Sequence, residues 1–276
     1  MTHGATNRVG AVLALAALAA YGPVAAADTL AGFDCLIEPN ALVRVSTREE
    51  GILDAVLVDR GDIIKQGQIL ATLESGVERI AVELARARSQ MRGTVDSRRA
   101  AADYRQRQAK RVQELYANKA ASYTEVDQAT TDLLLAQKEL QDVTETMRLA
   151  EIELKRAEHA LERRTIRSPV DGVVVQRLLL PGESVKDTPI IAVAAVHPLN
   201  VEVIVPVRAL QMIRMGMEAE VTPQVPGGTA QRARVVVVDR LIDAASNTFG
   251  VRLELPNEDY AIPGGLRCDV RFMPES

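Results

Sequence analysis

The sequence predicts an elongated α+β protein in which two related β half-units flank a long antiparallel helical hairpin, with a small β-barrel after them. Three observations predict this arrangement. An apolar, glycine-punctuated pattern occurs twice, within residues 46–76 and 165–196; a proline-free region with heptad periodicity lies between the copies, at 77–164; and short strand-like runs fill 197–276. A strand within residues 28–45 is expected to join the barrel.

Composition excludes several classes of function. The chain has 276 residues, 3% aromatic residues, no tryptophan and a formal charge of −4. A site that stacks bases or sugars would need several flat side chains, and a negative chain has no general attraction for nucleic acid. The sequence also lacks the glycine-rich phosphate-binding and nucleophile motifs of common enzymes, so we expect no catalytic site and no cofactor.

Residues 1–27 have the features of a cleavable export signal. Arg8 supplies the positive charge, Val9–Ala20 forms a short apolar core, and Ala25–Ala27 is a small-residue cleavage site. The alternative is an uncleaved anchor, because Val9–Ala27 contains 19 residues without a charge. Pro23 and the weakly hydrophobic alanine-rich core favour cleavage and therefore a periplasmic location.

Cysteine usage agrees with export. The only two cysteines are Cys35 and Cys268, one near each end of the mature chain. In an oxidising compartment they could form one disulfide that ties the termini together. Two separate buried thiols are the alternative, because a free cysteine is often a core residue.

The repeat itself aligns without a gap. GILDAVLVDRGDIIKQGQIL begins at Gly51 and GVVVQRLLLPGESVKDTPII begins at Gly172, an offset of 172 − 51 = 121 residues. The alignment places Gly61 on Gly182, in apolar runs broken by a turn, which predicts short strands joined by tight turns. Two related half-units in one chain indicate one composite β module.

Between the half-units, a heptad seam predicts two packed helices of about 40 residues each. In the second helix, apolar residues alternate steps of three and four at 126, 129, 133, 136, 140, 143, 147, 150, 154, 157 and 161. In the first helix, the expected seam contains Leu84, Met91, Val95, Ala102, Ala109, Val112 and Tyr116, with arginines at 88, 98 and 105 between them. At about 1.5 Å per residue, such a hairpin would project about 60 Å.

Charge predicts that the two helices pair with each other. The first is rich in arginine and the second in glutamate and aspartate, which suits an antiparallel hairpin. The heptad breaks in ANKAAS, Ala117–Ser122, so the turn is expected there. Ser122 can cap the second helix, with Glu125 three residues later completing a capping box.

Two β half-units that flank a long helical hairpin resemble the periplasmic adaptor subunits, or membrane fusion proteins, of RND-type efflux pumps. The resemblance implies that the half-units form one lipoyl-like (biotinyl-lipoyl) β-sandwich. It also implies a non-enzymatic adaptor that oligomerises as a ring and links an inner-membrane transporter to a TolC-like outer-membrane channel. The family's tip pattern of Arg, Leu and Ser falls on Arg111, Leu115 and Ser122, which are therefore candidate channel-docking residues.

Two other functions stay open. The chain could be an adaptor of an ABC or major-facilitator exporter, some of which keep an N-terminal anchor. A lipoyl or biotinyl carrier protein is a different class, but a carrier has its modified lysine at a turn between the half-units. Here the helical hairpin occupies that position, and Lys65 and Lys186 lie beside the glycine turns, where solvated lysines are expected.

The remaining residues predict a small β-barrel with a short helix. The strand-like runs are LNVEVIV, EAEVTPQV, ARVVVVDRLI, GVRLEL and LRCDVRF, and VRALQMI between the first two predicts the helix. Met212, Met215 and Met217 flank that helix and are expected to pack in the barrel rather than to bind a soft metal. His159 on the second long helix and His197 in a linker have no further ligand at metal-binding spacing, so no metal site is expected.

Overall fold

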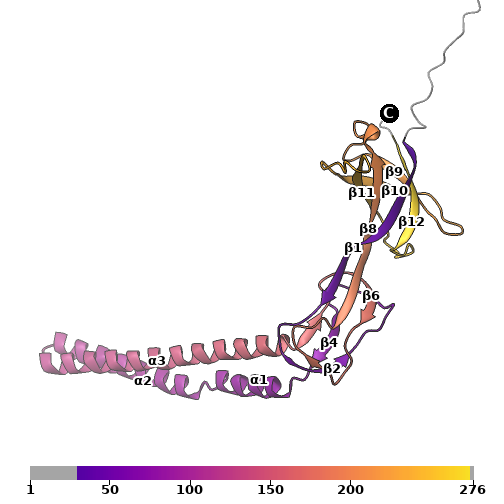
Figure 1. Cartoon of the computed structure of the whole chain (residues 1–276). Helices are drawn as coiled ribbons and strands as arrows, with labels where there is room; N and C mark the ends of the chain where they lie inside the picture. Colours follow the sequence, from indigo (N-terminus) through magenta and orange to yellow (C-terminus); the bar gives the residue numbers. More distant parts are fainter. Residues whose placement is uncertain (1–29, 274–276) are drawn as a thin grey trace, which may run out of the picture. The chain divides into compact units, whose positions relative to one another are not determined.

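The computed structural model describes residues 30–273, so the predicted signal at 1–27 lies outside the described residues. The chain divides into two compact units (Figure 1). The first contains the described part of residues 1–36 together with 201–254 and 266–273, and the second contains 37–200 and 255–265. Residues 37–45 and 255–265, predicted to be part of the barrel region, thus group with the sandwich.

The sandwich of the second unit is built from both half-units. One sheet has the strand order β5-β4-β2-β7, and in the other β3 pairs with β6 and β6 with β8. The strands are β2 (Gly51–Val56), β3 (Ile63–Ile64), β4 (Ile69–Leu73), β5 (Thr165–Arg167), β6 (Gly172–Arg177), β7 (Ser184–Val185) and β8 (Ile191–Pro206).

The structure confirms the repeat and shows that its halves are interleaved. β2 and β6 have the same length and begin 121 residues apart, as do β3 and β7. Gly51 of β2 pairs with Val185 of β7, and the equivalent pair joins Gly172 of β6 to Ile64 of β3. Each half-unit therefore completes a sheet of the other, and neither has its own complete set of partners.

Equivalent positions also build the sandwich core. Leu53 and Val174, Ile64 and Val185, and Leu70 and Ile191 are three pairs at the offset of 121, and all six side chains are buried. The turns repeat as well. Gly61 and Gly182 both have positive φ, of 94° and 90°, and both donate their backbone N–H across to the other half-unit, to the carbonyls of Val174 and Leu53. A side chain at either position would strain this left-handed backbone.

The helical hairpin lies between the half-units and has three helices. α1 (Gly76–Ser89) and α2 (Gly93–Ala117) form the first arm, and α3 (Tyr123–Glu162) forms the second as one 40-residue helix. The prediction of an uninterrupted first arm was wrong, because the helix breaks at residues 90–92 (Figure 1). Gly93 directly follows the break, and glycine is a poor helix former.

The seam of α3 is confirmed, since all eleven predicted positions are buried or half-buried; Thr130, Asp132 and Ala160 beside them are half-buried as well. In α2, Val95, Ala102 and Ala109 are buried as predicted. The predicted register was wrong in α1, where Val82, Ala85 and Ser89 are buried while Leu84 is exposed, and Met91 is exposed in the break that follows. The break changes the helical phase, so one continuous heptad pattern cannot describe both helices of the first arm.

The first unit is a β-barrel whose strands follow the order β1-β12-β9-β10-β11-β8, and β1 also pairs with β8. Alternate side chains of these strands point inward, as in β9, where Ala219, Val221 and Pro223 are buried. The additional strands are β1 (Ala31–Val45), β9 (Glu218–Pro223), β10 (Gln231–Val238), β11 (Thr248–Leu255) and β12 (Leu266–Phe272). The helix predicted in VRALQMI is only a 3-10 turn, η2 (Val207–Ala209), because the segment continues in turns toward β9.

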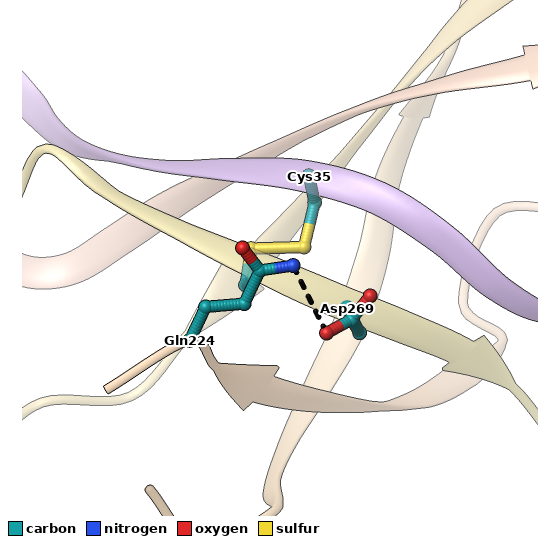
Figure 2. Close-up of a disulfide and its surroundings, with 4 residues drawn as sticks. Cys35, Gln224 and Asp269 are labelled. Carbon is teal, nitrogen blue, oxygen red and sulfur yellow. Dashed lines mark hydrogen bonds between the residues drawn. A yellow bond between two sulfur atoms is a disulfide. The ribbon is translucent and has the colours of Figure 1, made fainter. Parts of the chain in front are cut away.

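A disulfide joins two strands of this barrel. Cys35 of β1 is bonded to Cys268 of β12, with 4.9 Å between their Cα atoms and a sequence separation of 233 residues. Figure 2 shows the bond together with Gln224 and Asp269, whose side chains form a 3.1 Å hydrogen bond beside it. The first and last strands of the described residues are thereby bonded to each other.

The predicted linker at His197 is part of a strand instead. β8 runs without a break from Ile191 to Pro206, so no linker separates the predicted domains at this point. His197 accepts a 3.0 Å hydrogen bond at Nδ1 from the backbone N–H of Asn257. The buried Asn257 side chain in turn bonds the backbone of Val196 and Ile262, which explains why residues 255–265 belong to the sandwich unit.

Candidate functional site: the hairpin tip

The tip is a tight turn that leaves few backbone groups unpaired. Lys119 adopts a left-handed conformation, with φ 56°. Its N–H donates to the carbonyl of Tyr116 at 2.9 Å, and the N–H of Ala120 donates to the carbonyl of Leu115 at 2.8 Å. This pair of bonds is a Schellman motif, which satisfies the last carbonyls of a helix. It fixes the end of α2 and the direction in which the chain turns toward α3.

The capping box predicted at Ser122 is confirmed. The hydroxyl of Ser122 accepts a hydrogen bond from the N–H of Glu125 at 3.3 Å, and the Glu125 carboxylate accepts one from the N–H of Ser122 at 2.6 Å. The backbone N–H and then the hydroxyl of Ser122 lower the pKa of Glu125. The side chain of Ser122 therefore has a structural role whether or not it also meets a partner.

Unlike the side chain of Ser122, those of Leu115 and Arg111 take part in none of the capping hydrogen bonds of the turn. Leu115 is 44% exposed, and Arg111, one helical turn earlier, is also exposed. Arg111 takes no part in the ion pairs found within residues 30–273. The tip thus presents an apolar side chain beside a free guanidinium, which suits a protein interface.

Sequence reasoning missed two aromatic residues of this tip. Tyr116, predicted to lie on the seam, is about half exposed, and Tyr123 is more exposed still. Tyr123 directly follows the helix cap and precedes the first seam residue, Val126, so its position outside the heptad pattern was a usable signal. With Leu115, these tyrosines give the tip three large side chains in contact with solvent.

Interhelical ion pairs hold the two arms in register. Four arginines of the first arm pair with acidic residues of α3, which confirms the predicted charge complementarity. The shortest pair joins Arg98 Nη1 to Glu139 Oε2 at 2.7 Å. Exposed pairs of this kind contribute about 0–1 kcal/mol each, so their main effect is on alignment of the arms. The four are Arg86–Glu158, Arg88–Glu153, Arg98–Glu139 and Arg105–Asp132.

The root of the hairpin is tied to the sandwich by Arg164. Its guanidinium bonds the carboxylate of Glu78 and, through Nη1, the carbonyl of Glu50 at 2.8 Å. The pKa of Glu78 is lowered, first by its own backbone N–H and then by Arg164. One side chain thereby connects the end of α3, the start of α1 and the strand region before β2.

The other sequence candidates do not gather into a second site. Lys65 and Lys186 are both exposed, and Lys186 Nζ lies 3.2 Å from Glu50 Oε1. Met217 is buried, whereas Met215 is exposed. Across residues 30–273, histidine, cysteine and acidic side chains nowhere form a group of three that could hold a metal ion. Within that same range, no helix has both the length and the apolar character needed to cross a bilayer.

An interleaved β-sandwich with an inserted helical hairpin forms one unit of the chain, and a β-barrel forms the other. Two family models match the chain: a CzcB-like barrel-sandwich hybrid domain over residues 41–195 and a CusB-like β-barrel domain over 199–276. The chain therefore belongs to the membrane fusion proteins, the adaptor family of efflux systems.

Individual relatives are distant. An uncharacterised protein of Haemophilus influenzae is 26% identical over 86% of this chain and 56% of its own length. The cobalt-zinc-cadmium resistance protein CzcB of Cupriavidus metallidurans is 25% identical over 82% of this chain and 41% of its own length. The chain thus spans about half the length of the curated relatives it matches. MacA from Actinobacillus actinomycetemcomitans shares the fold, with a TM-score of 0.71 and 22% identity over 88% of this chain and 78% of MacA.

Proposed function

We propose that this chain is a non-enzymatic periplasmic adaptor that links an inner-membrane RND-type transporter to a TolC-like outer-membrane channel. The observation that carries the proposal is the hairpin tip, where Leu115 is 44% exposed and Arg111 has no ionic partner in the described chain. α3 alone has 40 residues, so it reaches about 60 Å away from the sandwich. That reach suits a bridge across a compartment better than a role within a single domain.

Docking would bury Leu115 against the channel and place Arg111 near an acceptor on it. A charge at position 115 would then be buried without a partner, which costs several kcal/mol in an interface but little at an exposed tip of the free protein. Leu115→Asp should therefore abolish efflux-dependent resistance while expression and circular dichroism stay normal. Leu134→Asp is the matched control, since Leu134 lies on the same hairpin and is 54% exposed.

A second readout does not depend on knowing the substrate. A photo-crosslinking amino acid at position 115 should attach the adaptor to the outer-membrane channel in living cells, and the same group at position 134 should not. Undiminished resistance in Leu115→Asp, together with no crosslink from position 115, would mean that the tip pattern serves only to cap the hairpin.

The proposed ring has support from an unusual second face of α1. Val77, Ile80, Leu84 and Met91 are each more than half exposed. Val77, Ile80, Leu84 and Ala87 follow steps of three and four on the side of α1 opposite the buried Val82, Ala85 and Ser89, and Met91 lies just beyond the end of the helix. A stripe of this spacing fits a second helix, and the outward side of α3 carries exposed Leu149 and Ile152 at a similar height, because Arg88 pairs with Glu153.

Neighbouring copies would bury both faces if α1 of one copy packs on α3 of the next, a head-to-tail contact that closes into a ring. A double variant, Leu84→Cys with Ile152→Cys, should give a ladder of disulfide-linked species in cells on a non-reducing gel. The pair Leu84→Cys with Leu134→Cys is the control. A ladder from the control alone, or from neither pair, would contradict this contact.

The transporter could instead be an ABC or major-facilitator exporter, for which no feature of the described residues argues specifically. N-terminal sequencing of the mature protein separates the two cases in part, because an N-terminus near residue 28 excludes a retained anchor. Copurification of the transporter after crosslinking in the native host then identifies its class directly.

A further inference from the structure

One end of the β-barrel combines exposed apolar and basic side chains. The segment 207–217 between β8 and β9 and the loop 239–247 between β10 and β11 lie beside each other there, because the N–H of Val207 donates to the carbonyl of Asn247 at 3.1 Å. They enclose a shallow pocket of about 580 Å³, lined by Leu210, Ile213, Met215 and Ile242 among others. We call these two segments the 207/239 end of the barrel.

Four apolar side chains of this end are exposed, whereas Ala209, Ile213 and Met217 of the same segments are buried. Leu241 is 86% exposed and Met215 is 71% exposed, and Met212 and Ile242 are also exposed. Single apolar residues on a surface are ordinary, but four from two adjacent segments form a patch of the kind that marks an interaction site. Leu241 stands out because its side chain has almost no protein contact.

Three arginines accompany this patch. Arg208, Arg214 and Arg240 are exposed, and none of them appears in the ion pairs of the described chain. The acidic residues of the same segments are Asp239 and Asp243, so the end has a formal charge of 3 − 2 = +1, while the whole chain carries −4. Asp243 is occupied within its own loop, where it accepts hydrogen bonds from the N–H of Ala245 and the hydroxyl of Ser246. Asp239 lies against Gly250 of β11.

We propose that the 207/239 end binds the surface of an anionic lipid bilayer. Leu241 and Met215 would enter the boundary between headgroups and acyl chains, and the three arginines would contact lipid phosphates. Protruding apolar side chains combined with basic ones are the chemistry of interfacial membrane binding. A bilayer accepts isolated protruding side chains without a matching pocket, whereas a protein partner would need one, and this favours lipid. The inference is independent of the proposed channel contact at the hairpin tip.

The absence of tryptophan from the sequence permits a direct test. Leu241→Trp in the full chain places a single indole at the proposed insertion point. Its emission should shift to the blue on addition of vesicles of phosphatidylglycerol and phosphatidylethanolamine, and brominated lipids should quench it. Val225→Trp is the control, because Val225 is 40% exposed in the loop after β9, at the opposite end of that strand.

Charge is tested by a triple variant. Replacing Arg208, Arg214 and Arg240 by glutamine in the Leu241→Trp protein should weaken binding to anionic vesicles on the order of 100-fold. Vesicles of phosphatidylcholine alone should bind weakly at all salt concentrations. The proposal is overturned if the Leu241→Trp emission does not respond to anionic vesicles or if Val225→Trp responds equally. It is also overturned if only detergent-solubilised transporter changes the emission, which would assign the patch to a protein partner.

Discussion

Arg164 holds Glu78 with two hydrogen bonds to one carboxylate oxygen, at 3.0 Å from Nε and 2.6 Å from Nη2. Both side chains are less than one-fifth exposed, so this pair is better shielded from solvent than the ion pairs farther along the hairpin. It joins the first turn of α1 to the residues just after α3. The two arms of the hairpin are therefore fixed to each other where they leave the sandwich.

The first prediction concerns this pair. Glu78→Gln should lower the free energy of unfolding by about 1–3 kcal/mol at pH 7, because it removes the charged partner of a guanidinium that is only 19% exposed. Glu158→Gln, which removes a more exposed pair with Arg86, should cost less than about 1 kcal/mol. Urea unfolding of both variants measures the difference. Equal losses of stability would mean that the Arg164–Glu78 pair stabilises the fold no more than the exposed Arg86–Glu158 pair.

The same pair predicts a pH dependence. The pKa of Glu78 lies below its usual 4.5 in the folded protein, owing to its own backbone N–H and then to Arg164. The stabilisation by this pair is therefore complete above about pH 4.5. It is lost as the pH falls through the lowered pKa that Glu78 has in the folded protein. The difference in stability between the native protein and Glu78→Gln should shrink below pH 4.5. A difference that stays constant down to pH 3 would exclude this linkage.

The two repeat glycines predict unequal effects of the same substitution. A Cβ on Gly172 would overlap the backbone carbonyl of Ala194, which cannot move without disturbing β8. A Cβ on Gly51 would lie 2.8 Å from Arg164 Nη1, the end of a flexible side chain. Gly172→Ala should therefore cost about 3 kcal/mol or more, and Gly51→Ala about 1 kcal/mol. Thermal unfolding of the pair would contradict this account if Gly51→Ala were the more damaging change.

The disulfide predicts that the stability of the folded protein depends strongly on redox state. A bridge between residues 233 apart stabilises by about 5 kcal/mol in the chain-entropy model. Cys35→Ser with Cys268→Ser should therefore lower the unfolding midpoint in urea markedly, and a reducing agent should affect the native protein but not this variant. Non-reducing peptide mapping of periplasmic protein should recover the two cysteines in one linked species. Recovery of both as free thiols would refute the bond.

Ser122 requires a pair of variants, because it caps α3. Ser122→Ala should remove the cap and cost about 0.5–2 kcal/mol, whereas Ser122→Asp keeps a capping oxygen and should cost little. If the hydroxyl also contacts the channel, both variants should lose efflux. If capping is its only role, Ser122→Asp should retain efflux, and measurement of both stability and resistance distinguishes the two cases.

The sequence predicted those features that depend on strict spacing. The repeat at an offset of 121, the seam of α3 and the capping box at Ser122 each follow from residue types at fixed intervals, and the structure has them all. The register of α1 was missed because its helix has two apolar stripes, and the pattern alone does not say which stripe faces α3. The break before Gly93 contains no proline, so the sequence has no strong signal that the helix would be interrupted there.

Two other errors have a common cause. His197 with Pro198, and the apolar run VRALQMI, have local features of a linker and of a helix, but neither segment adopts that structure. In both places the pairing of β8 decides the outcome, since the strand continues through His197 and the following turns must return the chain to β9. Such pairing joins residues far apart in sequence, and local patterns do not encode it.

The inserted hairpin also changes how the interleaved sandwich can form. Thr72 of β4 pairs with Thr165 of β5, so 93 residues must close into a loop before these strands meet. A helical hairpin can form outward from its turn, so that each new contact closes only a short loop, and helices form quickly. Once α1 has aligned with α3 and Arg164 has met Glu78, the path between Thr72 and Thr165 shortens to a few residues, which lowers the entropy cost of closure by about 2 kcal/mol. Formation of the hairpin would thus bring the second half-unit next to the first, so that β4 and β5 can pair.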